Sequence, residues 1–62
     1  MDRELDLFEK LPDGSILWRD VLYGKENAIA KLRELAALSS NEFMAVHVPS
    51  REVVASANIP KT

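Results

Sequence analysis

The turn at residues 12–14 is the feature that most constrains how this chain can fold. It reads Pro-Asp-Gly and stands between two stretches that are rich in apolar residues. Proline presets the first central torsion of a type I turn, and Gly14 can adopt the left-handed conformation that follows it. This pattern is typical of a three-residue hairpin loop with a glycine bulge. We therefore predict an antiparallel hairpin with strands at residues 5–11 and 15–23.

The register of this hairpin follows if Leu11 pairs with Ser15, whereas a two-residue loop would shift every pair. The predicted cross-strand pairs are Lys10 with Ile16, Phe8 with Trp18, Leu7 with Arg19, and Leu5 with Val21. Phe8 and Trp18 then form an aromatic pair. Glu9 and Arg19 become diagonal neighbours on the opposite face of the hairpin.

The chain after Gly24 predicts one helix and a second hairpin. Residues 25–38 place apolar side chains at the spacing of one buried helical stripe, and Asn41 can take the left-handed position that ends a helix. Strands are expected at residues 42–48 and 52–57.

These elements predict a single α+β domain over residues 1–62. The element order is ββαββ, and it favours a four-stranded antiparallel sheet with the helix packed on one face. The loop of the second hairpin is expected to hold Arg51 in a glycine-like conformation. Residues 58–62 are expected to form a tail.

One helix covers one face of such a sheet, yet both predicted hairpins carry apolar residues on both faces. Soluble monomers rarely expose contiguous apolar patches, so the surplus indicates a partner on the open sheet face or along an edge strand. A twisted sheet whose strand ends fold over is the alternative. The residues expected at the interface are Phe8, Ile16, Trp18 and Leu22. If Trp18 faced the helix, the open face would instead carry Leu17, Arg19, Val21 and Tyr23.

The length and composition also point to association. A domain of 62 residues buries only about 60% of the surface that its unfolded chain exposes. Such small domains are commonly stabilised by disulfides, metals or oligomerisation, but this chain has no cysteine and a single histidine. We expect no metal and no cofactor, and either a well-packed core or a homodimer or other protein partner.

The charge pattern disfavours nucleic acid as a partner. The formal net charge is -2 and the basic residues are scattered, whereas a nucleic-acid binder needs a concentrated basic surface. A nucleic-acid-binding module that uses the sheet, with Arg19, Lys10 and Arg51 on phosphates, remains the alternative function. No apolar stretch approaches the roughly 18 residues of a membrane span, and the acidic start of the chain lacks the basic region of a signal peptide. We expect a cytoplasmic protein.

His47 is the only candidate for acid–base chemistry at neutral pH, and we expect it to be structural. It lies within a predicted strand among apolar neighbours, and no nucleophile-turn motif occurs in the sequence. We therefore predict no catalytic residues. A small hydrolytic or transfer enzyme would require a deep pocket with a serine or an acid within hydrogen-bond reach of His47.

Two resemblances can be named. The stretches "FEKLPDGSILWRD" and "NEFMAVHVPSREVVA", with the alanine-rich helix between them, resemble short uncharacterised bacterial proteins of about this length, a resemblance that implies no activity. The segment "WRDVLYGKENAIAKLRELAA" looks like the strand-to-helix passage of plant AP2-type DNA-binding domains. Those domains read DNA with strands rich in arginine and tryptophan, whereas these strands carry Asp6, Glu9 and Asp20. The sequence as a whole predicts a small non-enzymatic protein-interaction module.

Overall fold

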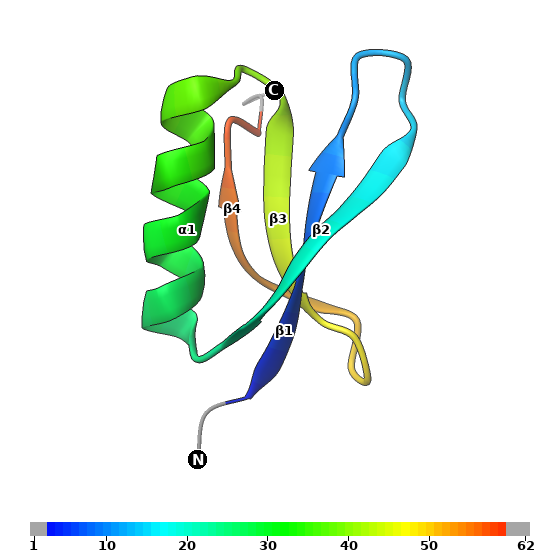
Figure 1. Ribbon diagram of the computed structural model, residues 1–62. Coiled ribbons are helices and arrows are strands. Elements are labelled where there is room, and N and C mark those ends of the chain that lie inside the picture. The colour runs from blue at the N-terminus through cyan, green and yellow to red at the C-terminus, as the bar shows by residue number, and fades with distance from the viewer. Residues whose placement is uncertain (1–2, 60–62) are drawn as a thin grey trace.

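The computed structural model describes residues 3–59, in which one helix packs on one face of a four-stranded antiparallel sheet (Figure 1). The elements are β1 (Glu4–Lys10), β2 (Ile16–Tyr23), α1 (Lys25–Leu38), β3 (Glu42–His47) and β4 (Glu52–Ala57). The α+β class and the ββαββ order are therefore confirmed. Most of the predicted tail, residues 60–62, lies outside the described residues.

The strand order is β2-β1-β3-β4. Each hairpin contributes one central and one outer strand, and the two hairpins join where β1 pairs antiparallel with β3. The helix starts next to the outer strand β2 and returns the chain to β3, so it lies over β3 and β4 (Figure 1). The sequence does not fix this order, because no local signal shows which strands pair across the hairpins.

The loop of the first hairpin has the predicted form. The amide of Leu11 donates to the carbonyl of Ser15 over 2.8 Å, and the amide of Gly14 donates to the carbonyl of Leu11 over 2.9 Å. Gly14 has a φ of +91°, which glycine adopts at no steric cost. Asp13 Oδ1 accepts hydrogen bonds from the amide of Ser15 over 2.9 Å and from its hydroxyl over 2.6 Å.

The register of this hairpin is as predicted only in the half next to the loop. Lys10 pairs with Ile16 and Phe8 pairs with Trp18, but a β-bulge then leaves Arg19 as an extra residue in β2. In the half farther from the loop the predicted register is wrong by one residue. The observed pairs there are Leu7 with Asp20, Asp6 with Val21, and Leu5 with Leu22. A bulge moves every later side chain to the opposite face. Leu22 consequently packs against the core beneath α1.

The other outer strand carries a second bulge. Ala45 pairs with Ala55, but Val46 pairs with Val53, so Val54 is the extra residue in β4. Val54 packs against the core, while Val53 is 54% exposed on the opposite face. A regular strand without the bulge would place these two valines on the opposite faces.

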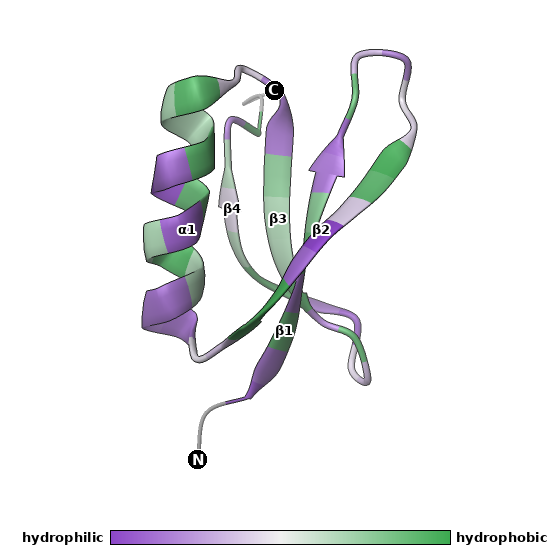
Figure 2. Ribbon diagram, in the orientation of Figure 1, coloured by the Kyte–Doolittle hydropathy of each residue, from purple (hydrophilic) through white to green (hydrophobic). Residues whose placement is uncertain are grey.

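The core lies between α1 and the two central strands. Its buried members are Leu5, Leu7, Ala28, Leu32, Phe43 and Ala45. The two small alanines allow the helix to approach the sheet closely, and Phe43 is the largest fully buried side chain of this core. Green and purple segments alternate along α1 in Figure 2, as expected for a helix that buries only one side.

The end of α1 differs from the prediction. Ser39, not Asn41, caps the helix, with an extended backbone at φ −150° and its amide donating to the carbonyl of Leu35. Asn41 is instead held by its side chain, whose Nδ2 donates to Glu9 Oε2 over 2.7 Å. Left-handed backbone does occur at Arg51, as predicted, and at Asn58.

Candidate interaction surface

The side of the sheet that faces away from α1, which we call the open face, is organised in rows that cross the strands. Cross-strand partners share a face, so the registers place Trp18, Phe8, Met44 and Ser56 in one row, and Val21, Asp6, Val46 and Val53 in the next. The apolar members of these two rows form what we call the apolar band: Trp18, Phe8, Met44, Val21, Val46 and Val53.

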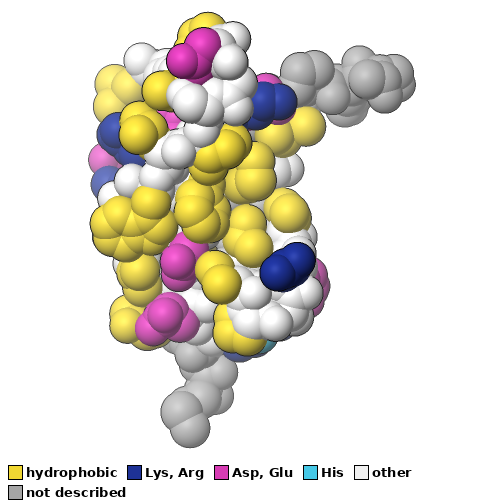
Figure 3. Space-filling view, turned by 90° about the vertical axis from the view of Figure 1, so that its right-hand side faces the viewer, with side chains coloured by type: hydrophobic (Ala, Val, Ile, Leu, Met, Phe, Trp, Pro, Cys, Tyr) yellow, Lys and Arg dark blue, Asp and Glu magenta, His cyan; other side chains and the backbone are white. Residues whose placement is uncertain are grey.

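Polar rows flank the apolar band at both ends. Above it, towards the β1–β2 loop, Lys10 and Glu42 pair across β1 and β3, with Lys10 Nζ 3.9 Å from Glu42 Oε2. Ile16 of β2 completes this row. Below it, the hydroxyl of Tyr23 donates to Glu4 Oε1 over 3.4 Å. Figure 3 shows hydrophobic side chains gathered over this side of the molecule, with acidic and basic side chains among and around them.

The apolar band projects from the sheet at its two edges. Trp18 is 56% exposed on β2 and Val53 is similarly exposed on β4, whereas Phe8, Met44 and Val46 between them are half-buried. The exposed indole is the largest apolar group on this face. Large aromatic side chains of this kind anchor protein interfaces.

One charged side chain interrupts the apolar band. Asp6 is half-buried and pairs with Val21 on one side and with Val46 on the other. Within residues 3–59 no hydrogen bond or ion pair joins its carboxylate to another side chain. A carboxylate covered by an apolar partner without a compensating group would be strongly unfavourable.

The residues predicted for the interface divide between the two faces. Phe8, Ile16 and Trp18 lie together on the open face, whereas Leu22 lies on the helix side. The sequence-based set missed Val21 because of the bulge at Arg19. The consecutive polar residues Arg19 and Asp20 are the one local sign of it, since they interrupt the alternation of β2.

The edge strands are less suited to pairing with another chain than the open face is. Both outer strands are bulged, and the amide of Val21 donates to the side chain of Asp20 over 2.8 Å. Bulges and charged side chains at sheet edges oppose strand addition.

Two surface hollows of about 440 and 240 Å³ lie between β2 and α1, and Lys31 lines both.

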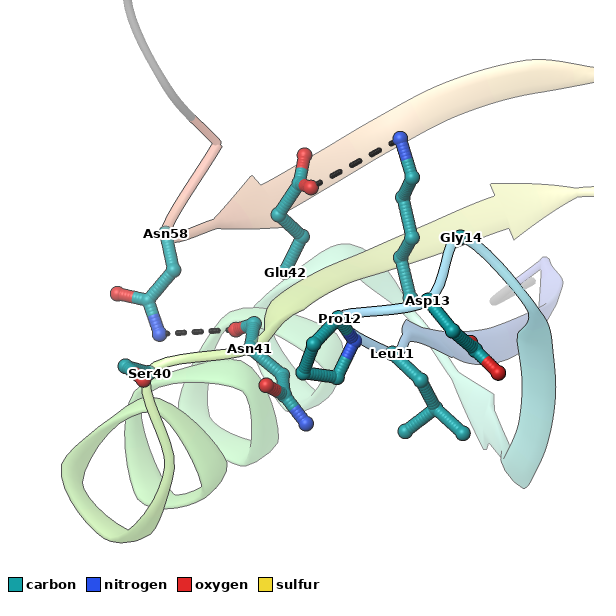
Figure 4. Close-up of a pocket in the computed structure, with 9 residues that line it drawn as sticks. Leu11, Pro12, Asp13, Gly14, Ser40, Asn41, Glu42 and Asn58 are labelled. Carbon is teal, nitrogen blue, oxygen red and sulfur yellow. Dashed lines mark hydrogen bonds and ion pairs between the residues drawn. The ribbon is translucent and has the colours of Figure 1, made fainter.

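A polar hollow of about 550 Å³ lies at one end of the sheet, between the β1–β2 and α1–β3 loops (Figure 4). Asn58 Nδ2 donates there to the carbonyls of Ser39 and Asn41 over 2.9 and 3.0 Å, and Lys10 faces Glu42. These donors are largely used within the protein, where they fasten the end of β4 to the start of β3.

His47 meets half of the condition set for an enzyme. Its Nδ1 lies 2.7 Å from the hydroxyl of Ser50, which is also 3.3 Å from the carbonyl of His47. His47 is the last residue of β3 and Ser50 lies in the β3–β4 turn, so the contact closes that turn. Four hollows within residues 3–59 have volumes of about 240 to 550 Å³, and His47 lines none of these four.

The bases considered for phosphate contact do not gather on one surface. Arg19 Nη1 lies 3.4 Å from Glu9 Oε1, Lys10 is paired at the upper row, and Arg51 lies in the opposite turn. Glu9 is only 7% exposed, accepts a hydrogen bond from Asn41 and forms an ion pair with Arg19. The predicted proximity of Glu9 and Arg19 is thus confirmed as an ion pair.

No family model, no curated protein and no solved structure matches the chain. Among the described residues, no group of three or more histidine or acidic side chains is arranged to hold a metal ion. The helix in residues 3–59 is not long and apolar enough to cross a membrane.

Proposed function

We propose that the protein is a non-enzymatic interaction module that forms a homodimer through its open face. The observation that carries this proposal is the apolar band with a polar row at each end. An apolar centre with a polar rim is the usual anatomy of a protein interface. The bulged edges favour contact through the face over contact through an edge strand.

The energetics support the same proposal. Covering the exposed part of Trp18 removes on the order of 100 Å² of apolar surface from water, which contributes about 2–3 kcal/mol per copy. Each of the other five members of the apolar band adds a smaller amount. Association of two chains costs several kcal/mol of lost freedom, so the whole band is needed for a stable dimer.

The proposal includes a cytoplasmic location. Small secreted domains are commonly rich in disulfides, and this chain has no cysteine. Burial of the open face would supply the additional stabilisation that a disulfide supplies in such domains.

The decisive measurement is the solution mass by light scattering on a sizing column, over a range of protein concentrations. We expect a dimer that dissociates on dilution. Trp18→Glu should give a monomer at every concentration, because it places a charge in the apolar band. Leu38→Glu is the matched control, since Leu38 is 81% exposed at the end of α1, and it should leave the dimer intact.

A wild-type chain that remains monomeric at the highest concentration would overturn self-association. Equal loss of the dimer in Trp18→Glu and Leu38→Glu would overturn the assignment of the open face as the interface. Circular dichroism of each variant establishes that the fold is retained.

A further inference from the structure

The open-face residues of β1 are arranged so that the strand complements its own reverse. Asp6, Phe8 and Lys10 follow one another at every second position, with an acid before the aromatic ring and a base after it. Turning this strand end for end about Phe8 exchanges the acid and the base. A twofold symmetric interface requires self-complementarity of this kind.

We propose that two copies pack open face against open face with their β1 strands reversed, about a twofold axis at Phe8. Asp6 of each copy then forms an ion pair with Lys10 of the other copy. This inference rests on the self-association proposed above and specifies its geometry. It supplies the Asp6 carboxylate with a cation that residues 3–59 of its own chain do not provide.

The dimensions of packed sheets allow these ion pairs. Asp6 and Lys10 each lie two residues, or about 7 Å, from Phe8 along the strand, and face-to-face sheets lie about 10 Å apart. A relative rotation of about 30° between the sheets displaces facing positions by only about 3–4 Å at that radius. The four-carbon stem of lysine and the aspartate side chain together cross most of the gap between the sheets.

The same axis also brings part of the apolar band of each copy together. It lies along the row of Trp18, Phe8 and Met44, so residues of this row face the same row of the second copy. The row that contains Lys10 then faces the row that contains Asp6 in the other copy, which sets Ile16 against Val21 of that copy. The two exposed apolar side chains Ile16 and Trp18 of β2 thereby each face an apolar side chain.

Lys10 can serve both its own chain and the second copy. Its ammonium lies 3.9 Å from Glu42, and its side chain is 44% exposed. An ammonium has three donors, so one contact with Glu42 leaves donors for the partner's Asp6. The long distance to Glu42 indicates that this internal pair does not hold Lys10 firmly.

A second symmetric way to stack the faces is unfavourable at Asp6. A twofold axis parallel to the strands, between β1 and β3, would set Asp6 opposite Val46 of the second copy. The carboxylate would then be covered by a valine with no cation in reach, which is strongly unfavourable. The reversed arrangement sets Val46 opposite Glu42 of the second copy, but Lys10 of that copy compensates the charge of Glu42. Charge therefore favours the reversed arrangement over this alternative.

The test uses two charge-reversed chains, Asp6→Lys and Lys10→Asp, with their masses distinguished by a tag on one of them. Each alone places like charges opposite each other, and should weaken its homodimer about tenfold or more. Mixed together, the two chains regain both ion pairs, so native mass spectrometry should show a heterodimer of roughly wild-type affinity. Arg33→Glu, an exposed reversal on α1, is the matched control and should leave the wild-type dimer unchanged.

The outcomes separate this inference from the proposal beneath it. A monomeric wild-type chain overturns both. A wild-type dimer whose two reversed variants still form homodimers and show no preference for each other overturns only the reversed geometry. If a reversed chain does not fold, the neutral variants Asp6→Asn and Lys10→Gln decide. Each should weaken the dimer several-fold, and the double variant should weaken it by less than the two effects multiplied, as coupled residues do. Independent effects would overturn the ion pair.

Discussion

At the residue scale, two carboxylates on opposite faces of β1 show how position decides what a charge does. Glu9 is buried, and Asn41 and Arg19 compensate its charge from two other parts of the chain. It thereby fastens the α1–β3 loop and β2 to the central strand. Asp6 lies three residues earlier on the open face, without such a partner among residues 3–59. An internal carboxylate satisfied by the chain serves the fold, whereas Asp6, unpaired among the described residues, is the carboxylate for which we propose a cation of the second copy.

The turn residue Asp13 gives a pH-dependent prediction. Hydrogen bonds from the hydroxyl of Ser15, and then from its amide, lower the pKa of Asp13 below its ordinary value of 3.8. A carboxyl with a lowered pKa in the folded state stabilises the fold above its unfolded pKa, and this contribution is lost as the pH falls through the folded pKa. Asp13→Asn keeps an acceptor oxygen but removes the charge. Urea unfolding at neutral pH should therefore show a small deficit for the variant.

The deficit of Asp13→Asn should close as the pH falls below 3.8, because the wild-type carboxyl then also becomes neutral. Ser15→Ala is the companion variant, since it removes the strongest cause of the lowered pKa. In the Ser15→Ala background, Asp13→Asn should change stability less at neutral pH. A deficit that persists unchanged in acid would contradict the assigned role of the charge.

At the element scale, the bulges in β2 and β4 determine which side chains reach the open face. Arg19 in β2 and Val54 in β4 are extra residues at nearly the same level of the sheet. Bulges bend strands and increase their twist, so both outer strands curve about the central pair, as Figure 1 shows. The extra residue in each strand places Leu22 and Val54 on the helix side.

The bulge in β2 predicts that two adjacent substitutions lower the free energy of unfolding by different amounts. Leu22→Thr should lower the free energy of unfolding by about 2 kcal/mol, because it removes apolar contacts with the core and places a hydroxyl there. Val21→Thr is nearly isosteric on the open face and should cost less than about 1 kcal/mol. Urea unfolding at a protein concentration that keeps the chain monomeric measures both. A regular strand without the bulge would reverse the order of the two effects.

The local elements could be predicted from the sequence, whereas the faces of the outer strands could not. The Pro-Asp-Gly loop and the apolar stripe of α1 are determined by residues close together in the chain, and both occur where the pattern indicates. The positions of Val21 and Leu22 depend on a bulge whose only local sign is Arg19 followed by Asp20. The apolar band also requires the pairing of β1 with β3, which joins residues far apart in the sequence. Phe8, Ile16 and Trp18 could be placed together because they lie on the near side of the bulge.

At the scale of the whole molecule, the fold divides its apolar residues between an internal core and the open face. Within residues 3–59, the buried apolar core consists of six residues contributed by one short helix and the two central strands, and the apolar band on the other side of the sheet has the same number of members. A domain of this size is only marginally stable alone. Dimerisation through the band would place the sheets at the centre of a four-layer molecule, with a helix on each outer side.

This arrangement predicts that thermal stability depends on protein concentration. Because the dimer dissociates when its chains unfold, each tenfold increase in concentration stabilises the folded state by about 0.7 kcal/mol per chain. For a domain of this length that corresponds to a rise in Tm of about 3–5 °C. Trp18→Glu should melt at one temperature whatever its concentration, while Leu38→Glu should keep the wild-type slope. Calorimetry over a hundredfold range of protein concentration compares the three chains. Over this range the wild-type Tm should rise by about 6–10 °C. A wild-type Tm that does not change over this range would mean that the open face of the folded chain is uncovered in solution.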